Sequence, residues 1–127
     1  LESLTELRLS NCGCAQARDL GAALARNRGL RTLSLPRNAL RDAGARSLAD
    51  ALGTNTTLHA LDVARNGIGD DGAEAFAHAL ENNSTLHTLN LSGNMIQDNG
   101  AAAFIDAFTD NITLQGLDLS GNAISEA

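Results

Sequence analysis

Lysine, tyrosine and tryptophan are absent from this 127-residue sequence, proline occurs once, and phenylalanine occurs only three times. Tyrosine and tryptophan most often anchor protein interfaces, so a protein partner must be held mainly by polar and charged contacts. A lysine-rich run and an exposed aromatic platform are the usual features of a surface that binds nucleic acid. The sequence has neither, and we expect no nucleic-acid partner.

Long apolar runs and motifs for chemistry are missing as well. The sequence contains no apolar stretch of about 18 residues and no cationic segment leading into an apolar one, so we expect neither a membrane span nor a signal peptide. It contains no phosphate-binding glycine loop, no G-x-S-x-G motif and no nucleophile-base pair at a recognisable spacing. We therefore expect no enzyme activity, no catalytic residue and no cofactor.

The two cysteines, Cys12 and Cys14, are too few to define a metal site. No further cysteine and no histidine cluster completes a set of four ligands, so we predict no metal. Both cysteines fall at positions that we expect to be buried. Reduced, buried thiols favour an intracellular, cytoplasmic location.

What the sequence does contain is one pattern repeated five times. Each copy has the frame L-x-x-L-x-L or a close variant, and the last four copies continue with Asn. Successive copies begin 26, 28, 28 and 28 residues apart, and a fixed period of this length is typical of a solenoid. The copies begin near Leu4, Leu30, Leu58, Leu86 and Leu114.

The alternation within the frame predicts a short strand with one buried face, and the apolar pattern behind it predicts a helix. Because one such unit cannot bury its apolar face alone, neighbouring copies must stack. We predict an α/β solenoid over residues 1–127, a single domain with a parallel sheet on its concave face and helices on its convex face. Residue 1 falls inside a copy, and the last copy stops before its helix. We therefore expect a fragment of a longer chain, in which either flanking sequence covers the two ends or the ends associate with another copy.

Asparagine recurs where each strand ends and its backbone groups lose their partners. A buried side-chain amide can bond to those groups, and stacked copies can bond from one repeat to the next. We predict a structural ladder formed by Cys12, Asn38, Asn66, Asn94 and Asn122.

Three further features are expected to recur along the helices. An aspartate before Gly-Ala should cap the helix that it opens, at Asp42, Asp70 and Asp98. An inward stripe should bury Leu48 and Leu52, Phe76 and Leu80, and Phe104 and Phe108, and so all three phenylalanines. Left-handed helix ends are expected at Asn27, Asn55, Asn83 and Asn111. This structural role explains the three N-x-[ST] sequences in the chain better than glycosylation does.

The polar residues of the strand frames should line the open, concave face of the sheet. Nine arginines against six acidic residues give residues 1–65 a charge of +3, whereas residues 66–127 hold nine acidic residues and no cation, which gives −9. Four arginines fall on the predicted face. We interpret them as a basic patch for an acidic surface of a protein partner, with solvated surface charge as the alternative.

The candidate partner-binding residues on this face are Arg8, Arg31, Arg37, Arg65, His59, His87, Asp62, Asn90 and Asp118. Within this set we expect Asp62 and Asp118 to set the orientation of the partner. His59 and His87 occupy the same frame position on adjacent strands, so their side chains should lie about 5 Å apart. Such a pair could begin a metal site or respond to pH. Without a third ligand nearby we interpret it as polar surface.

The 28-residue period with the motif N-x-[IL]-x-D-x-G-A-x-x-[LF], as in residues 66–76 and 94–104, resembles the ribonuclease-inhibitor-like leucine-rich repeats. The resemblance covers nearly the whole chain and implies a horseshoe that recognises a protein with its concave face. The uniform repeats and the absence of lysine look most like the repeat domain of a bacterial effector or a NOD-like receptor. That likeness implies a target-recognition domain, in the host cytoplasm for an effector, beside a catalytic neighbour. A scaffold like that of the Ran-type GTPase-activating proteins is the alternative.

Overall fold

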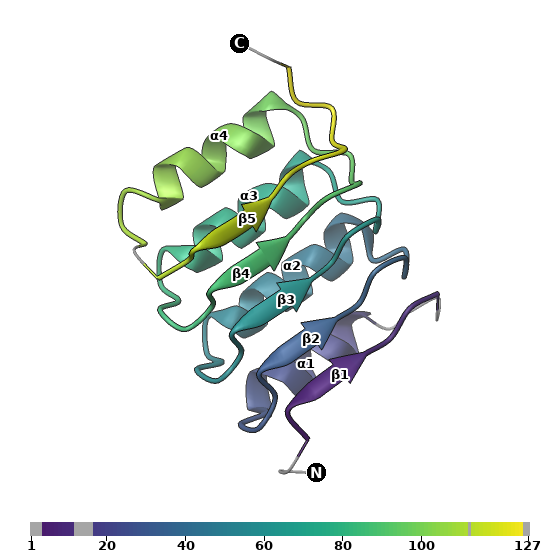
Figure 1. Cartoon of the computed structure of the whole chain (residues 1–127), viewed down its shortest axis with the longest axis vertical. Coiled ribbons are helices and arrows are strands. Elements are labelled where there is room, and N and C mark those ends of the chain that lie inside the picture. The colour runs from purple at the N-terminus through teal and green to yellow at the C-terminus, as the bar shows by residue number, and fades with distance from the viewer. Residues whose placement is uncertain (1–3, 12–16, 112, 126–127) are drawn as a thin grey trace.

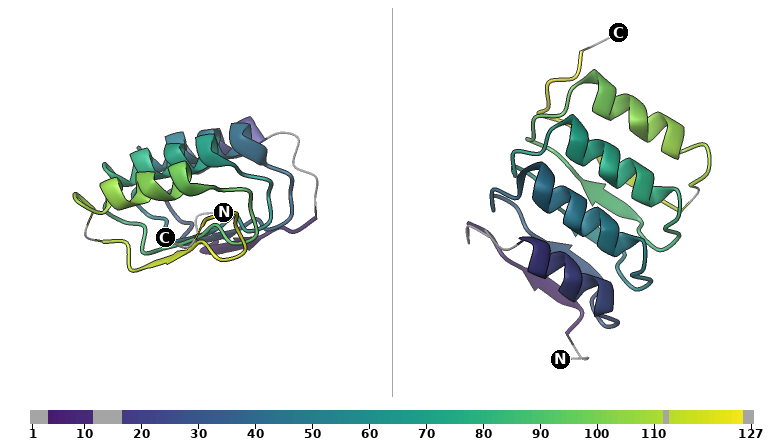
Figure 2. Two further views of the ribbon diagram at one scale, coloured as in Figure 1. Left: turned by 90° about the horizontal axis from the view of Figure 1, so that it is seen from above. Right: turned by 180° about the vertical axis from the view of Figure 1, so that it is seen from behind.

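Five short parallel strands form a single sheet, and the helices between them cover one of its two faces (Figure 1 and Figure 2). The computed structural model describes residues 4–11, 17–111 and 113–125. The sheet order follows the chain from β1 to β5, which confirms the predicted α/β solenoid. Along the chain the elements are β1 (Glu6–Arg8), α1 (Ala17–Arg26), β2 (Thr32–Ser34), α2 (Arg41–Leu52), β3 (Ala60–Asp62), α3 (Asp70–Leu80), β4 (Thr88–Asn90), α4 (Asp98–Ala107) and β5 (Gly116–Asp118).

Equivalent residues of neighbouring repeats lie side by side in the sheet. The middle leucines of all five strands are in register, from Leu7 in β1 to Leu117 in β5. Those of β2, β3 and β4 are only 1–2% exposed and form one core cluster with the helix residues Leu48, Phe76 and Phe104. Since burying one such side chain contributes about 1.5–3 kcal/mol, the stack of like residues holds the repeats together.

Neighbouring helices approach closely because a glycine stands where they meet. A Cβ on Gly72 would lie 2.9 Å from the Cβ of Ala45 and 2.5 Å from Cγ2 of Ile68. A Cβ on Gly100 would lie 3.1 Å from the Cβ of Ala73 in the same way. Only glycine fits without moving the adjacent helix, so the Gly-Ala pairs of the sequence set the spacing between repeats.

The asparagine ladder at the strand exits is present, and each rung joins two repeats. The Oδ1 of Asn66 accepts from the amides of Asn38 and Leu40 at 2.8 and 3.3 Å. Its Nδ2 donates to the carbonyls of Leu35 and Ala64 at 2.9 and 3.1 Å. The side chain is 1% exposed, so water cannot replace these bonds.

The rungs formed by Asn94 and Asn122 repeat this pattern. Each donates to a carbonyl of the preceding repeat and accepts from an amide of that repeat. Cys12, the predicted first rung, lies outside the described residues. The ladder is therefore confirmed from Asn38 to Asn122.

A second asparagine ladder follows the helices, where the sequence predicted left-handed helix ends. The Nδ2 of Asn83 donates to the carbonyls of Leu52 and Asn55 in the preceding repeat, at 2.8 and 3.3 Å. Its Oδ1 accepts from the amides of Thr85 and Leu86, at 2.9 and 2.8 Å.

The prediction of a left-handed backbone was wrong, because the side chain itself satisfies the amides of the turn and no positive φ is needed there. The buried, bonded amide nitrogens cannot carry a sugar in the folded chain at Asn55, Asn83 and Asn111.

The aspartates of the Gly-Ala motif cap helices, but not the helices to which they belong. The Oδ1 of Asp42, which lies in the first turn of α2, accepts from the amides of Gly69 and Gly72 at the start of α3, at 2.7 and 3.1 Å. Asp70 of α3 caps α4 in the same way. The predicted capping within one repeat was wrong because Asp42 and Asp70 lie in the first turn of their own helices and face the next helix.

The C-terminal end of the solenoid exposes residues that interior repeats bury. Phe108 is 42% exposed and Ile105 is 70% exposed, whereas the equivalent Leu80 and Ala77 are 0% and 3% exposed. The prediction that all three phenylalanines are buried was therefore wrong for Phe108. The reason is that no helix among the described residues packs on the far side of α4 (Figure 1).

The two ends also offer complementary backbone groups. The carbonyl of His87 accepts the amides of Gln115 and Gly116 from the next strand. By the same geometry the carbonyl of Gln115 is an acceptor at the C-terminal end, and the amides of Thr5 and Glu6 are donors at the N-terminal end. Negative charge is concentrated in the C-terminal half and positive charge in the N-terminal half. The two ends of the described sheet are therefore complementary in backbone groups and in charge.

Removing a central rung of the first ladder should destabilise the chain more than removing a terminal one. We expect Asn66→Ala to lower the free energy of unfolding by roughly 2–4 kcal/mol, because it leaves buried donors and acceptors unpaired. Asn122→Ala should cost about 1 kcal/mol, since water reaches that half-buried rung. Urea denaturation measures both losses, and equal losses would contradict the role of burial.

Removing a cap should loosen the helix of the following repeat. With Asp42→Ala, hydrogen exchange measured by NMR should accelerate at the amides of Gly69 and Gly72, because their acceptor is lost. The amide of Gly44 in α2 should keep its protection, since it donates to the backbone carbonyl of Leu40. We expect a loss of about 1 kcal/mol in stability. Faster exchange at Gly44 alone would show that the cap acts within its own repeat.

The open ends should make this chain self-associate as its concentration rises. Light scattering should report species larger than the monomer, and Phe108→Asp with Ile105→Asp should return the chain to a monomer because these changes place charge on the apolar end. Ala43→Asp, on an exposed position of the interior helix α2, is the matched control and should change nothing. Equal association of all three proteins would exclude the end-to-end contact.

Candidate functional site

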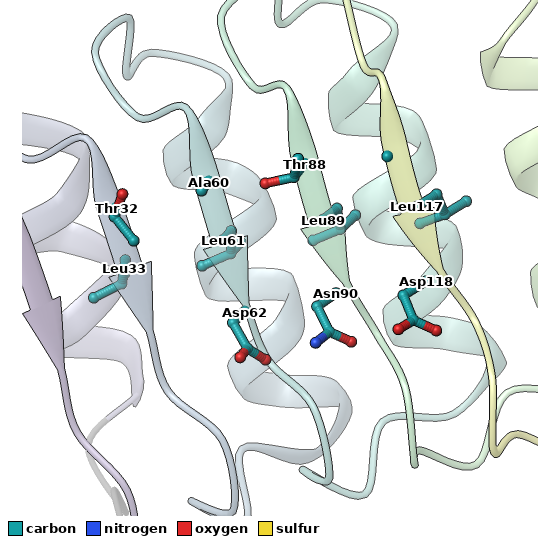
Figure 3. A pocket seen from close by; sticks show the side chains of 11 residues that line it. Thr32, Leu33, Ala60, Leu61, Asp62, Thr88, Leu89, Asn90, Leu117 and Asp118 are labelled. Atoms are coloured by element: carbon teal, nitrogen blue, oxygen red, sulfur yellow. The ribbon is translucent and has the colours of Figure 1, made fainter.

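The face of the sheet opposite the helices carries a groove across β2 to β5 (Figure 3). We call it the concave groove, and its volume is about 340 Å³. Its side chains come from two columns, each with one residue per strand. The first column, which we call the floor, consists of Thr32, Ala60, Thr88 and Gly116, and the second column contributes Asp62, Asn90 and Asp118.

The floor is wide because its side chains are small. Ala60 on β3 and Gly116 on β5 flank Thr88 on β4. A Cβ on Gly116 would lie 3.4 Å from Cγ2 of Thr88, so a larger side chain there would fill the groove. Sequence reasoning placed these residues on the open face but did not single them out. A column of small residues at the 28-residue period was the signal that could have found the groove.

The second column holds its polar groups in fixed directions. The Oδ1 atoms of Asp62 and Asn90 accept from the amides of Ala64 and Ser92, two residues further on, each at 2.9 Å. The Oδ2 of Asp62 lies 3.5 Å from the hydroxyl of Ser34, at the limit of a hydrogen bond. One oxygen of each side chain is thus used by a local turn, and in Figure 3 the side chains leave β3, β4 and β5 on the same side.

Asp118 forms the same turn and has an additional bond. Its Oδ1 accepts from the hydroxyl of Ser120 at 2.6 Å and from the amide of Ser120 at 3.0 Å. These two bonds hold the pKa of the Asp118 carboxyl below its usual value, the hydroxyl bond having the larger effect. The carboxylate therefore remains ionised at a lower pH than an ordinary aspartate.

The two histidines lie beside the groove, just before the strands begin, and are close together as predicted; their rings are also stacked. The ring centroids of His59 and His87 are 5.0 Å apart, with an angle of 10° between the rings. Each Nδ1 lies 2.7 Å from a carbonyl, that of Thr57 or Thr85. Since a carbonyl only accepts, each Nδ1 carries the hydrogen. Within the described residues no three His, Cys, Asp or Glu side chains converge to hold a metal ion.

The four candidate arginines lie around the groove and do not line it. Arg8 on β1 is exposed and pairs with Glu6 of the same strand. Arg31 precedes β2, whereas Arg37 and Arg65 follow β2 and β3 in turns, with φ of 59° and 57°. The structure therefore places Arg31 at the edge of the sheet where the strands begin, and the other two at the edge where the strands end.

The arginines of the turns after the strands also have a packing role. A Cβ on Gly93 would lie 2.7 Å from Cγ of Arg65, so the stem of this arginine covers the next turn. Arg41, which sequence reasoning did not include, covers Gly67 in the same way, with Cδ 2.8 Å from the added Cβ. Arg41 follows the ladder asparagine, and the strand pattern gave no signal for it.

Comparison with known proteins agrees with this architecture. A family model described as Leucine Rich repeat matches residues 26–49, 54–77, 82–104 and 110–126, well over half of the chain. A search of the curated proteins finds no match. Within the described part of the chain, no helix has the length and apolar character that a membrane crossing requires.

Two solved structures are similar in fold. One is the actin-binding site 2 of leiomodin-1, with a TM-score of 0.82 and 24% identity, covering 91% of this chain and 69% of that one. The other is the C-terminal domain of tropomodulin from Caenorhabditis elegans, with a TM-score of 0.83 and 18% identity, covering 94% of this chain and 75% of that one. At these identities the likeness concerns the fold. The family match, the sheet register and the asparagine ladder lead to one conclusion: the chain belongs to the leucine-rich repeat family.

Proposed function

We propose that this chain is a protein-recognition module that binds its partner on the open face of the sheet, and that it catalyses no reaction itself. The observation that carries the proposal is the concave groove. It is the one face of the described sheet that the helices leave uncovered, and its polar side chains are held in fixed directions by local turns. Groups held in this way lose little conformational entropy on binding.

Actin is the first partner to test. The similar structure of leiomodin-1 is an actin-binding site, and its fold covers most of this chain. At 24% identity the likeness to leiomodin-1 supports a common fold, but it does not identify which residues of this chain would contact actin. Actin therefore enters as a proposal that co-sedimentation with actin filaments can decide.

The role of the parent protein stays a prediction. Neither of the two similar structures comes from an effector, a NOD-like receptor or a Ran-type GTPase-activating protein. The proposed recognition surface is the same in each of those settings. An intracellular location is likewise proposed, because we expect Cys12 and Cys14, which lie outside the described residues, to be buried and reduced.

Filling the groove should abolish partner binding without unfolding the chain. Thr88→Arg with Gly116→Arg places two long side chains across the floor, and we expect this variant to lose at least about tenfold in affinity for a protein that the wild type binds. The measurement is capture from a eukaryotic lysate with quantitative mass spectrometry, with actin filaments tested separately.

The matched control for this experiment is Ala43→Arg with Ala102→Arg, which adds two arginines to exposed positions of α2 and α4. Circular dichroism should show that both variants remain folded. The proposal requires a protein that the control retains and the groove variant loses. Identical capture by the wild type and both variants would place recognition elsewhere.

A further inference from the structure

We propose that the concave groove binds a basic segment of the partner protein, with arginine or lysine side chains lying across the floor and their cations on Asp62 and Asp118. This inference rests on the proposed function and specifies the chemistry of the partner. It differs from the sequence-based hypothesis of an acidic partner, because the charges that line the groove are negative. The arginines lie at its edges.

Neither groove carboxylate forms an ion pair with a cation among the described residues. The arginine ion pairs found there join Arg8 to Glu6 and Arg46 to Asp71, and neither involves the groove. From Asn66 onward the chain contains no arginine or lysine at all. An acidic partner would bring like charges together over the two carboxylates, whereas a basic one provides the missing counter-charge.

The distance between the two carboxylates determines which spacing of basic residues in the partner segment can reach both of them. Asp62, Asn90 and Asp118 are in register on three successive strands. Adjacent strands lie about 4.8 Å apart, so the two aspartates are separated by roughly 10 Å across the sheet. A segment in the polyproline II conformation rises about 3.1 Å per residue and has three residues per turn, so basic residues three positions apart lie on the same side and reach both carboxylates. The side-chain amide of Asn90 lies between them and can bond to the segment's backbone.

The floor suits the apolar stems of such side chains. Ala60 and Gly116 leave room for methylene groups beside Thr88, and lysine and arginine stems cover apolar surface while their charged ends stay polar. Arginine is favoured over lysine, because its planar guanidinium bonds to a carboxylate through two parallel N–H groups. A phosphate backbone would meet only negative charge in the groove, which excludes nucleic acid as the occupant.

The chain itself supplies an isosteric test. Asn90 forms the same local turn as Asp62 and Asp118, so Asp62→Asn and Asp118→Asn remove charge and keep that turn. Conversely, Asn90→Asp adds a third carboxylate to the same column. The fold of these variants should match that of the wild type, and any change in binding then reports charge in the groove.

The probe is a labelled peptide containing Arg-Ser-Ser-Arg, and the control peptide has both arginines replaced by citrulline, which has the same shape without the charge. We expect the double Asp→Asn variant to bind the arginine peptide about tenfold more weakly than the wild type. We expect Asn90→Asp to bind it more tightly, and the citrulline peptide to bind none of the proteins. Added salt should weaken the wild-type complex.

Amide chemical shifts measured by NMR test the proposal even if the peptide binds too weakly for an affinity to be measured. The amides of Ala64 and Ser120 donate to the two carboxylates and should shift when the arginine peptide is titrated into the wild type. Equal shifts with the double Asn variant, or no shifts in the wild type, would overturn the proposal.

The protein identified by lysate capture separates the two proposals. If the filled-groove variant fails to capture that protein and the double Asn variant still captures it, the partner binds this face but the proposal of a basic segment is wrong. Retention with both variants would reject the proposed function itself.

Discussion

The structure depends on one constraint: buried polar groups at the turns of each repeat must be bonded by the neighbouring repeat. Asn66 bonds to the turn that follows the strand of the preceding repeat, and Asn83 bonds to the C-terminal end of the preceding helix. Asp42 caps the helix of the following repeat. An unpaired group in these buried turns costs about 1–3 kcal/mol. Because all three links run between equivalent positions, they fix the sheet register and the 28-residue period together.

This constraint leaves the open face of the sheet free to serve another purpose. The inward column of each strand must remain apolar, the ladder positions must remain amides, and the capping positions must remain acceptors. The floor bears no such requirement and can carry Thr, Ala or Gly. The adjoining column needs only an acceptor for its local turn, so it can carry charge. The residues proposed to contact the partner are thus ones that the stacking of repeats does not need.

Much of the fold could be predicted from the sequence, because a repeat period determines which residues form columns. The strands, the first asparagine ladder and the close approach of His59 and His87 followed from position in the frame alone. The errors share one cause. Periodicity does not say whether a polar side chain acts within its own repeat or on a neighbour, so the cap of Asp42 was assigned to the wrong helix. Nor does it show where stacking stops, so Phe108 was expected to be buried. The depth of the groove depends on side chains from four strands at once, which no single frame displays.

In the column that contains Asp62, Asn90 and Asp118, the fold requires a hydrogen-bond acceptor but not a negative charge. In each case a side-chain oxygen accepts the amide two residues further on, and Asn90 does this without a charge. Ser34 occupies the same column on β2, where the residue two positions further on is Pro36, which has no amide hydrogen to bond. The turn thus accounts for the presence of an amide or carboxylate but not for its charge. Asparagine at positions 62 and 118 would accept the same amide hydrogen bond, so the fold does not require the negative charges there. This is the reason why the two carboxylates are candidates for binding.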